Sequence, residues 1–410
     1  MKLLILTYGT DGDTRPLAAL GRALMDAGHE AQLLADGATL GTAEALGVPA
    51  TAIAGDIRQA LQPGGRASGL FEKNGFNNTA AELARIANDN ADHWLRAAVQ
   101  AGKGCDALII SGLAAFIGLS AAEYLGVKAI GTGMFPLTPT AAFLSPFLPP
   151  GKIPRMFNRL SHHFVNGLLW RSFRKATNAA RARVCDLPPR KSLWTGHPML
   201  YGVSPALLPT PSDWPDNASN CGQWLAPAKE WSPPEQLSEF LAAGEAPIYI
   251  GFGSMGGFDR KHLLEAIVGG MAGRRALFYP GWSGVSASDL PANIFVVGDT
   301  PHDWLLPRTA IAMHHGGSGT THSAARAGVP SIVVPFAGDQ AFWADRLNQA
   351  GVGVGLAGWK ALNATSLAES IRFAERDDVR SRARAMGERM RAEDGLKTAV
   401  SAIEKFNAAS

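Results

Sequence analysis

The amino-acid sequence predicts an α/β fold made of two Rossmann-like, doubly wound domains that face each other across a cleft. In both halves of the 410-residue chain, short apolar runs alternate with longer segments of helical composition. This alternation is typical of parallel sheets covered by helices. A proline-rich segment separates the two halves, and the chain is long enough for two ordinary domain cores.

The N-terminal half repeats a strand, a helix and a strand. The first unit is predicted over Leu3–Thr7, Arg15–Ala27 and Glu30–Ala35. The second unit is predicted over Asp106–Ile110, Leu113–Leu125 and Val127–Gly131. Between them, segment 55–80 has the Gly, Asn and Arg content of a loop over the sheet edge. We therefore expect one domain over residues 1–208.

A linker is predicted at 209–234, because its prolines interrupt any regular element there. Beyond it the pattern starts again, which defines a second domain over 235–394. Its first strand, helix and two further strands are expected over Pro247–Phe252, Arg260–Met271, Arg275–Tyr279 and Asn293–Val297. A last helix is expected within 395–410.

A glycine-rich turn follows the predicted strand Ala310–Met313 and precedes the predicted helix Thr320–Ala327. It reads His314, His315, Gly316, Gly317, Ser318, Gly319, Thr320, Thr321. Glycines let the backbone approach a ligand, and the unpaired N–H groups at a helix N-terminus favour phosphate. Hydroxyl and imidazole groups add donors. The turn is therefore predicted to bind an anion, although such turns also occur without a ligand.

Two polar residues, Asp339 and Gln340, follow the next predicted strand, Ser331–Val334. In an open α/β sheet, ligands bind outside the carboxyl ends of the strands, so both residues are expected beside the glycine-rich turn. A carboxylate next to an amide can bind adjacent hydroxyls of a sugar ring. Helix capping is the alternative role for Asp339. Together the two motifs predict a site for a diphosphate joined to a hexose.

The segment from Val297 to Gln340 resembles the donor-binding signature of the GT-B fold, family 1 glycosyltransferases. The resemblance is to bacterial antibiotic glycosyltransferases and sterol glucosyltransferases in particular, and it extends from Leu3 to Gly395. It implies that the first domain holds an acceptor and the second a nucleotide sugar. It also implies that the last helix crosses back onto the first domain.

The resemblance assigns roles to single residues. Asp13, in the sequence Gly12-Asp13-x-x-Pro16, matches the general base, with helix capping and the neighbouring Asp11 as alternatives. His314 matches the histidine that donates a hydrogen bond to the phosphate, and His315 takes a structural position. Because a tryptophan found in plant relatives is absent, the nucleobase is expected near His302. The donor-binding set is Thr10, Gly12, Ser254, Val297, His302, His314, Gly316, Gly317, Ser318, Gly319, Thr320, Asp339 and Gln340.

Two further segments of the first domain bear on the acceptor and on membranes. Apolar residues after the predicted strand at 127–131 either line an acceptor pocket or belong to the core; they are Met134, Phe135, Phe143 and Phe147. Residues 152–191 contain ten Lys or Arg and one acid, with apolar residues at helical spacing. This basic amphipathic region fits either peripheral contact with an anionic membrane or a solvated helix face packed on the core.

Composition narrows the class of protein. A net charge of +3 is too small to indicate a nucleic-acid partner. Three scattered cysteines, no signal-peptide pattern and no long apolar window predict a cytoplasmic protein without disulfides. No Asp-x-Asp motif lies beside the donor segment, so neither a metal nor a cofactor is expected.

The sequence therefore predicts an inverting glycosyltransferase that moves a hexose from a UDP- or dTDP-sugar. The expected acceptor is a hydroxyl of a hydrophobic small molecule of sterol, terpenoid, polyketide or flavonoid type. A sugar-nucleotide epimerase of the same fold and a non-catalytic nucleotide-sugar-binding protein are the alternatives. The sequence does not define the oligomeric state.

Overall fold

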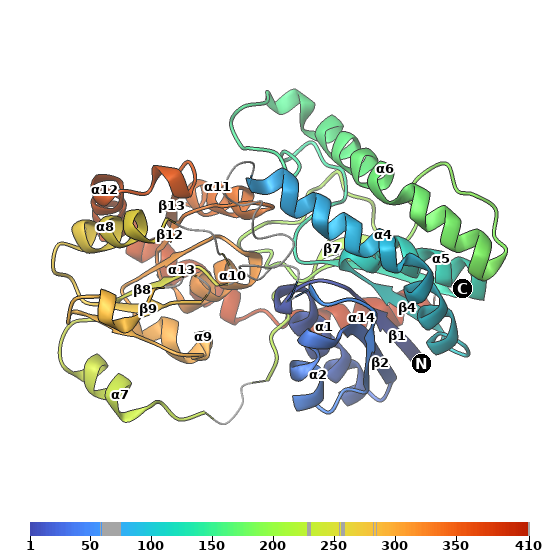
Figure 1. Cartoon of the computed structure of the whole chain (residues 1–410), viewed down its shortest axis with the longest axis horizontal. Helices are drawn as coiled ribbons and strands as arrows, with labels where there is room; N and C mark the ends of the chain where they lie inside the picture. Colours follow the sequence, from blue (N-terminus) through green and yellow to red (C-terminus); the bar gives the residue numbers. More distant parts are fainter. Residues whose placement is uncertain are drawn as a thin grey trace.

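The computed structural model describes residues 1–57, 59, 75–227, 231–253, 255, 259–281, 283 and 285–408. Two sheets, each with its own helices, lie side by side (Figure 1). The first sheet contains β1 Lys2–Leu6, β2 Glu30–Asp36, β3 Ala50–Ile53, β4 Ala107–Ile110, β5 Lys128–Gly133, β6 Met199–Tyr201 and β7 Ala218–Asn220. Its helices are α1 Asp11–Asp26, α2 Gly41–Ala45, α4 Gly75–Ala101, α5 Ala115–Leu125 and α6 Asn158–Cys185.

The second sheet contains β8 Ile248–Gly251, β9 Ala276–Tyr279, β10 Ile294–Val296, β11 Ile311–His314, β12 Ser331–Val333 and β13 Gly353–Gly355. The helices of this half of the chain are α7 Glu235–Ala242, α8 Arg260–Met271, α9 His302–Leu305, α10 Ser318–Ala327, α11 Gln340–Gln349, α12 Ala364–Ala374, α13 Asp377–Arg391 and α14 Gly395–Ala408.

Within the described residues, both sheets are parallel, which confirms the predicted fold class. Their strand orders are β3-β2-β1-β4-β5-β6-β7 and β10-β9-β8-β11-β12-β13. The central strands β4, β8 and β11 are buried throughout, because helices cover both faces of a parallel sheet. In each sheet the order reverses once, between β1 and β4 in the first and between β8 and β11 in the second.

Three boundaries differ from the predictions. Helix α1 begins at Asp11 rather than Arg15, because the Asp13 carboxylate accepts a hydrogen bond from the Thr10 N–H and closes the first turn. The predicted linker at 209–234 contains β7, which pairs with β6, so the first sheet extends into it. The predicted loop at 55–80 is partly helical, since α4 begins at Gly75, while 58 and 60–74 lie outside the described residues.

The last helix, α14, returns to the first domain and packs against α1 (Figure 1). Its buried residues Ala399 and Ile403 share a hydrophobic core with β1 and α1. Where the chain returns, Gly222 and Gly395 are in close contact: a Cβ added to Gly222 would lie 2.8 Å from the Gly395 Cα. Bulkier residues at this crossing would push the last helix away from the first domain.

A second hydrophobic cluster joins the two domains. It includes Phe143 and Trp214 from the first domain with Phe342, Trp343 and Met386 from the second. The rings of Phe143 and Phe342 lie 5.4 Å apart. This contact holds the carboxyl ends of the two sheets at the same interface. Among the described residues, no helix is both long and apolar enough to cross a membrane.

Candidate active site

The predicted anion site lies where the second sheet reverses its strand order. His314 is the last residue of β11 and pairs in register with Gly251, the last residue of β8. Strands β8 and β11 lead the chain in opposite directions across the sheet, so their carboxyl ends leave a crevice between the following loops. The predicted strand at 310–313 thus extends one residue further and places His314 at this switch point.

His314 presents a buried hydrogen-bond donor. Its side chain is fully buried, and Nδ1 accepts a bond of 3.1 Å from the Gly316 N–H. That bond assigns the proton to Nε2, which has no partner among the described residues. Burial lowers the pKa of His314 to about 3, with smaller lowering effects from the neighbouring His315 and His302. The imidazole is therefore a neutral donor, and an acceptor brought to Nε2 would satisfy it.

The turn after β11 requires glycine. Gly316 has a φ of +89°, and a Cβ there would lie 2.7 Å from Val333 Cγ1. Gly317 precedes α10, and no side chain caps the first N–H groups of that helix. Gly319 is exposed, and Thr320 is partly buried in the first turn. The helix therefore presents unpaired amides at the same edge as His314.

Ser318 makes a contact that the sequence analysis did not anticipate. Its hydroxyl donates a hydrogen bond of 2.7 Å to the Met134 carbonyl of the first domain. One turn later, His322 Nε2 accepts a bond of 3.2 Å from the Ser204 N–H. The N-terminal end of α10 is therefore fastened to the first domain, and the Ser318 hydroxyl proton is engaged there.

Asp339 and Gln340 lie at the start of α11, beside the turn. The Gln340 Oε1 accepts bonds of 2.7 and 3.0 Å from the backbone N–H groups of Phe336 and Ala337, and its Nε2 donates to Met255 Sδ. The Asp339 Oδ2 accepts a bond of 2.6 Å from the Trp343 indole. Gln340 thus shapes the loop, while Trp343, unnoticed in the sequence, orients Asp339 from the position four residues later.

Asp13 approaches the site from the opposite domain. Its Oδ2 accepts a 2.9 Å bond from the Thr10 N–H, and Oδ1 has no hydrogen-bond partner among the described residues. A Cβ on Gly9 would lie 2.2 Å from Asp13 Oδ2, so only glycine fits beside it. Burial raises the pKa of Asp13 to about 6, against the lowering effect of the Thr10 bonds. Gly12 is exposed in the same turn.

The carboxylates of Asp13 and Asp339 interact electrostatically across the domain interface. Burial raises the pKa of Asp339 to about 6, and the Trp343 bond opposes this rise. The charge of Asp13 adds to the rise, which requires Asp13 to lie near Asp339. The interface therefore brings Asp13 near Asp339, and Asp339 precedes Gln340, whose carbonyl lies beside Gly316 of the turn after His314.

The structure describes two of the residues expected near the nucleobase, Val297 and His302. The Val297 side chain is buried in the core, and its N–H donates to the Phe278 carbonyl. His302 is partly buried, with Nε2 3.4 Å from the Tyr249 hydroxyl. Burial lowers the pKa of His302, and the charge of Arg15 from α1 lowers it further, so Arg15 belongs to this region although the sequence did not single it out. Ser254 lies outside the described residues.

The four predicted acceptor residues occupy different positions. Phe143 is 4% exposed and forms part of the hydrophobic cluster between the domains, which is the core role left open for it. Phe135 and Phe147 are partly buried and pack edge to face, with ring centroids 5.1 Å apart. Met134 contributes its carbonyl to the bond with Ser318. In the described part of the chain, no group of three His, Cys, Asp or Glu side chains is placed to hold a metal ion.

Comparisons with known proteins identify the family and the fold. Residues 279–404 match the family described as "Erythromycin biosynthesis protein CIII-like, C-terminal domain". The "Sterol 3-beta-glucosyltransferase UGT80B1" of Arabidopsis thaliana is 31% identical over 420 residues, which cover 99% of this chain and 68% of that protein. A "Sterol 3-beta-glucosyltransferase" of Saccharomyces cerevisiae is 32% identical over 98% of this chain but only 35% of its own length. The chain thus spans about a third of the yeast protein.

Solved structures share the fold over the whole chain. Glycosyltransferase VinC, in complex with dTDP, superposes with a TM-score of 0.73 and 19% identity, covering 100% of both chains. The calicheamicin glycosyltransferase CalG4 superposes with a TM-score of 0.69 and 17% identity, covering 100% of this chain and 99% of the other. The chain belongs to the family 1 glycosyltransferases of the GT-B fold and is related to sterol glucosyltransferases and antibiotic glycosyltransferases.

Proposed function

We propose that this protein transfers a hexose from a UDP- or dTDP-sugar to a hydroxyl of a hydrophobic acceptor, with inversion at the anomeric carbon. In this proposal the second domain binds the donor and the first domain binds the acceptor. The observation that carries the proposal is the buried His314 Nε2–H, which has no partner among the described residues and lies beside the open N-terminus of α10.

The diphosphate of the donor would occupy this position. A phosphate oxygen would accept a hydrogen bond from His314 Nε2, and the first amides of α10 would face the same charge. Negative charge grows on the diphosphate as the sugar leaves, so these fixed donors stabilise the transition state more than the ground state. The glycines at 316 and 317 keep side chains away from this approach.

Asp13 would act as the general base. The acceptor hydroxyl gives its proton to the free Oδ1 of Asp13, and its oxygen forms a bond to the anomeric carbon. The bond from that carbon to the diphosphate oxygen breaks, and its electron pair leaves with the diphosphate. A single displacement of this kind inverts the configuration. With a pKa of about 6, Asp13 is largely ionised at neutral pH and still basic enough to accept the proton.

Asp339 would bind hydroxyls of the hexose. The electrostatic effect of Asp13 on Asp339 supports a sugar position between the base and the diphosphate site. Gln340 contributes through the loop that it closes and through its Nε2. The nucleobase would lie toward Val297 and His302, with Arg15 approaching from the first domain. Ser254 and Thr10 complete the proposed contacts to the diphosphate.

A sterol is the first acceptor to test. Proteins named sterol 3-beta-glucosyltransferases are 31% and 32% identical over nearly all of this chain, whereas the antibiotic glycosyltransferases are 17% and 19% identical. A flat, apolar acceptor with one hydroxyl suits a site next to Phe135 and Phe147, which offer ring surface. Terpenoid, polyketide and flavonoid acceptors follow in order of testing.

The purified chain should be incubated with UDP-glucose, UDP-galactose, dTDP-glucose and dTDP-rhamnose, each against sterols and the other acceptor classes. Release of nucleoside diphosphate with a new glycoside, of inverted configuration by proton NMR, supports the proposal. Donor binding without turnover would instead identify a binding protein. Conversion of one nucleotide sugar into another, without an acceptor, would identify an epimerase.

A further inference from the structure

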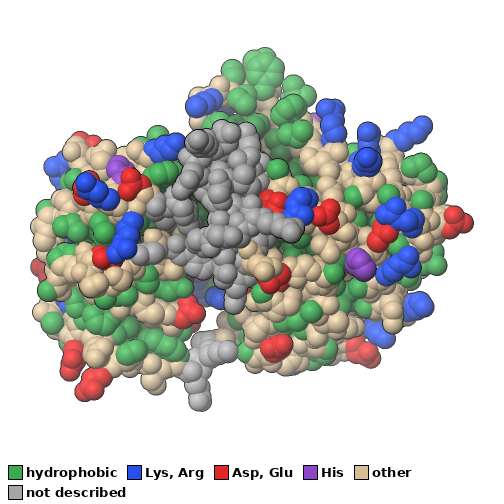
Figure 2. All heavy atoms as spheres, viewed as in Figure 1, with side chains coloured by type: hydrophobic (Ala, Val, Ile, Leu, Met, Phe, Trp, Pro, Cys, Tyr) green, Lys and Arg blue, Asp and Glu red, His purple; other side chains and the backbone are tan. Residues whose placement is uncertain are grey.

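Helix α6 and the turn before it expose a row of large apolar side chains. They form what we call the α6 ridge, at the start of the helix and in the short turn before it. The exposed fractions run from 43% for Phe157 to 83% for Met156. The ridge consists of Met156, Phe157, Leu160, Phe164 and Leu168. Figure 2 shows hydrophobic side chains gathered at the top edge of the molecule, where α6 begins in Figure 1.

The ridge follows a single face of the helix. Met156, Leu160, Phe164 and Leu168 are spaced by four residues, and the stretch from 157 to 168 is roughly 16 Å long at 1.5 Å per residue. The opposite face is buried. There Asn158 Nδ2 donates a bond of 3.0 Å to the Ala141 carbonyl. A helix that exposes a row of large apolar side chains to solvent is suited to contact with an apolar partner.

Unpaired positive charges lie at both ends of the ridge. Lys152 and Arg155 precede it, and Arg171, Arg174 and Lys175 continue the same helix beyond Leu168. These five side chains are exposed, and none pairs with an acid within the described residues. The sequence has no Asp or Glu from Lys152 to Cys185. The exposed surface is therefore apolar in its middle and cationic at its ends.

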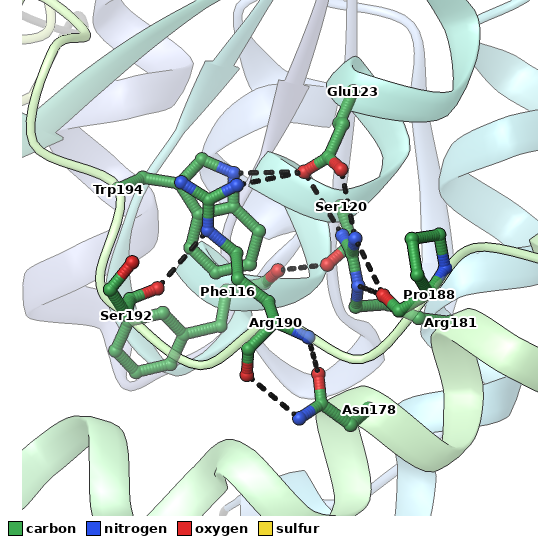
Figure 3. Close-up of polar contacts among 9 residues, drawn as sticks. All are labelled: Phe116, Ser120, Glu123, Asn178, Arg181, Pro188, Arg190, Ser192 and Trp194. Atoms are coloured by element: carbon green, nitrogen blue, oxygen red, sulfur yellow. Dashed lines mark hydrogen bonds and ion pairs between the residues drawn. The ribbon is translucent and has the colours of Figure 1, made fainter.

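The other arginines of the basic region are occupied. Arg181, 1% exposed, and Arg190 both pair with Glu123, and Trp194 donates to the same carboxylate (Figure 3). Three of the contacts at this end of α6 are an Arg181–Glu123 bond of 2.8 Å, an Arg190–Trp194 ring distance of 4.2 Å and an Arg183–Asp92 bond of 2.7 Å. Arg159 pairs with Asp213. The arginines at the far end of the region are thus paired, and the free charge lies around the ridge except for the exposed Lys191.

We propose that the α6 ridge docks on an anionic membrane surface. The apolar side chains would enter the boundary between headgroups and acyl chains, and the five cations would contact lipid phosphates. Charge decides between this occupant and a second copy of the chain. Two facing ridges would bring ten cations together with no acid between them, which is unfavourable, whereas anionic lipids complement them.

The helix that carries the ridge also contacts the segment proposed to bind the acceptor. The buried face of α6 contacts the segment 137–145: His162 Nε2 lies 3.1 Å from the Phe143 carbonyl, and Asn166 Nδ2 donates to the Leu137 carbonyl. A docked α6 would hold this segment at the lipid surface, where sterol-like acceptors are dissolved. Only this link rests on the proposed transferase function; the docking itself does not.

Vesicle flotation of the full chain, without donor or acceptor, tests the docking. We expect the protein to float with vesicles of phosphatidylcholine mixed with phosphatidylglycerol, to bind phosphatidylcholine alone weakly, and to bind less at high salt. The double variant Leu160→Glu/Phe164→Glu should lower partitioning on the order of tenfold or more. Each of Arg171→Glu and Arg174→Glu should lower it by roughly fivefold on anionic vesicles.

The control is Val268→Glu on α8, which adds one negative charge, half that of the double ridge variant, at an apolar side chain that is 41% exposed in the second domain. It should float like the unmodified protein. Thermal melting should be unchanged in all variants, because every substituted side chain is exposed. The proposal is overturned if the unmodified protein stays with the unbound fraction, or if the ridge variant floats as well as the control. It is also overturned if sedimentation shows a dimer that the ridge variant dissociates.

Turnover with acceptor in detergent micelles separates the two proposals. Ridge variants should retain it, because the substituted side chains are exposed and none belongs to the proposed catalytic or binding residues. If no glycoside forms under any condition but vesicle binding depends on the ridge, the transferase function fails and the docking stands. If turnover is normal and the ridge has no effect on flotation, the docking fails and the transferase function stands.

Discussion

The substitution Asp13→Asn isolates the proposed base, because the amide has the same shape and keeps the structural bond. The oxygen of the introduced amide can still accept the 2.9 Å hydrogen bond from the Thr10 N–H, so the first turn of α1 should persist. The amide cannot accept a proton. General-base catalysis contributes about 10² to 10⁴-fold in rate, and kcat should fall by that factor while donor affinity stays within about threefold.

The pH dependence of the unmodified protein provides a second measure of the same group. Since a base must be ionised to act, kcat/KM should rise with pH through the Asp13 pKa of about 6. Between pH 7 and pH 5 the ionised fraction of such a group falls about tenfold, and the rate should fall with it. In Asp13→Asn the residual activity should lack this limb. Initial rates of diphosphate release across this pH range measure both effects.

Stability should change in the opposite direction from activity. The folded-state pKa of Asp13, about 6, lies above the ordinary value of 3.8, because burial disfavours the charge. Its protonation therefore favours folding at low pH, and this contribution is lost as the pH rises through 6. At pH 7 the variant should be as stable as the unmodified protein or more so. The gain in the free energy of unfolding at pH 7 is at most about 3 kcal/mol, and it is smaller in practice because the side chain is only partly buried.

The control is Asp11→Asn, an exposed carboxylate in the same turn. It should retain near-normal turnover and the same pH limb. Turnover of Asp13→Asn within tenfold of normal would refute the assignment. Loss of activity in the Asp11 variant alone would transfer the role to Asp11. A lowered melting temperature in Asp13→Asn would mean that the side chain supports the fold rather than the reaction.

Three further predictions concern the second domain and the core. Replacing His314 by Ala should weaken nucleoside diphosphate binding by roughly 10 to 100-fold, by calorimetry, since one bond to a charged group is lost, whereas His315→Ala should change it little; equal losses would contradict the distinction. Gly316→Ala should destabilise the protein by about 2 kcal/mol or more in urea, because its Cβ would lie 2.7 Å from a neighbouring side chain, and Gly319→Ala, whose Cβ meets nothing within 4 Å, should not. Glu123→Ala should cost about 3 kcal/mol in the same assay, because the buried guanidinium of Arg181 loses its carboxylate and keeps only the Pro188 carbonyl; a loss under about 1 kcal/mol would count against that pair.

Local patterns account for the parts of the site that the sequence located. Glycines after an apolar strand, followed by small helix-forming residues, identify a strand-to-helix turn wherever it lies in the fold, and the structure gives Gly316 a φ of +89°. The position of His314 beside an open helix N-terminus follows from that turn alone. The alternation of strands and helices similarly identified the two parallel sheets. These features depend on residues within a few positions of each other.

Contacts between segments that are distant in the chain could not be predicted from the sequence. The Ser318 hydroxyl matched a donor-binding position, yet it bonds to Met134, 184 residues away. Strand β7 was also not predicted, because a strand of three residues among prolines shows no periodicity. It pairs with β6 and completes the first sheet. The contact of Trp343 with Asp339 is local, over four residues, but Trp343 belongs to no motif that would have indicated it.

The sequence by itself determined the fold class, the family and the two local motifs, because periodicity, turn chemistry and the spacing of His314 and Asp339 are properties of short segments. The tertiary structure alone decided that Asp13 lies near Asp339 across the interface, that Phe143 belongs to the core, and that Arg181, Arg183 and Arg190 of the basic region are paired with acids. The physical reason is that burial and pairing depend on which surfaces the two domains press together, and packing over long sequence separations sets that arrangement.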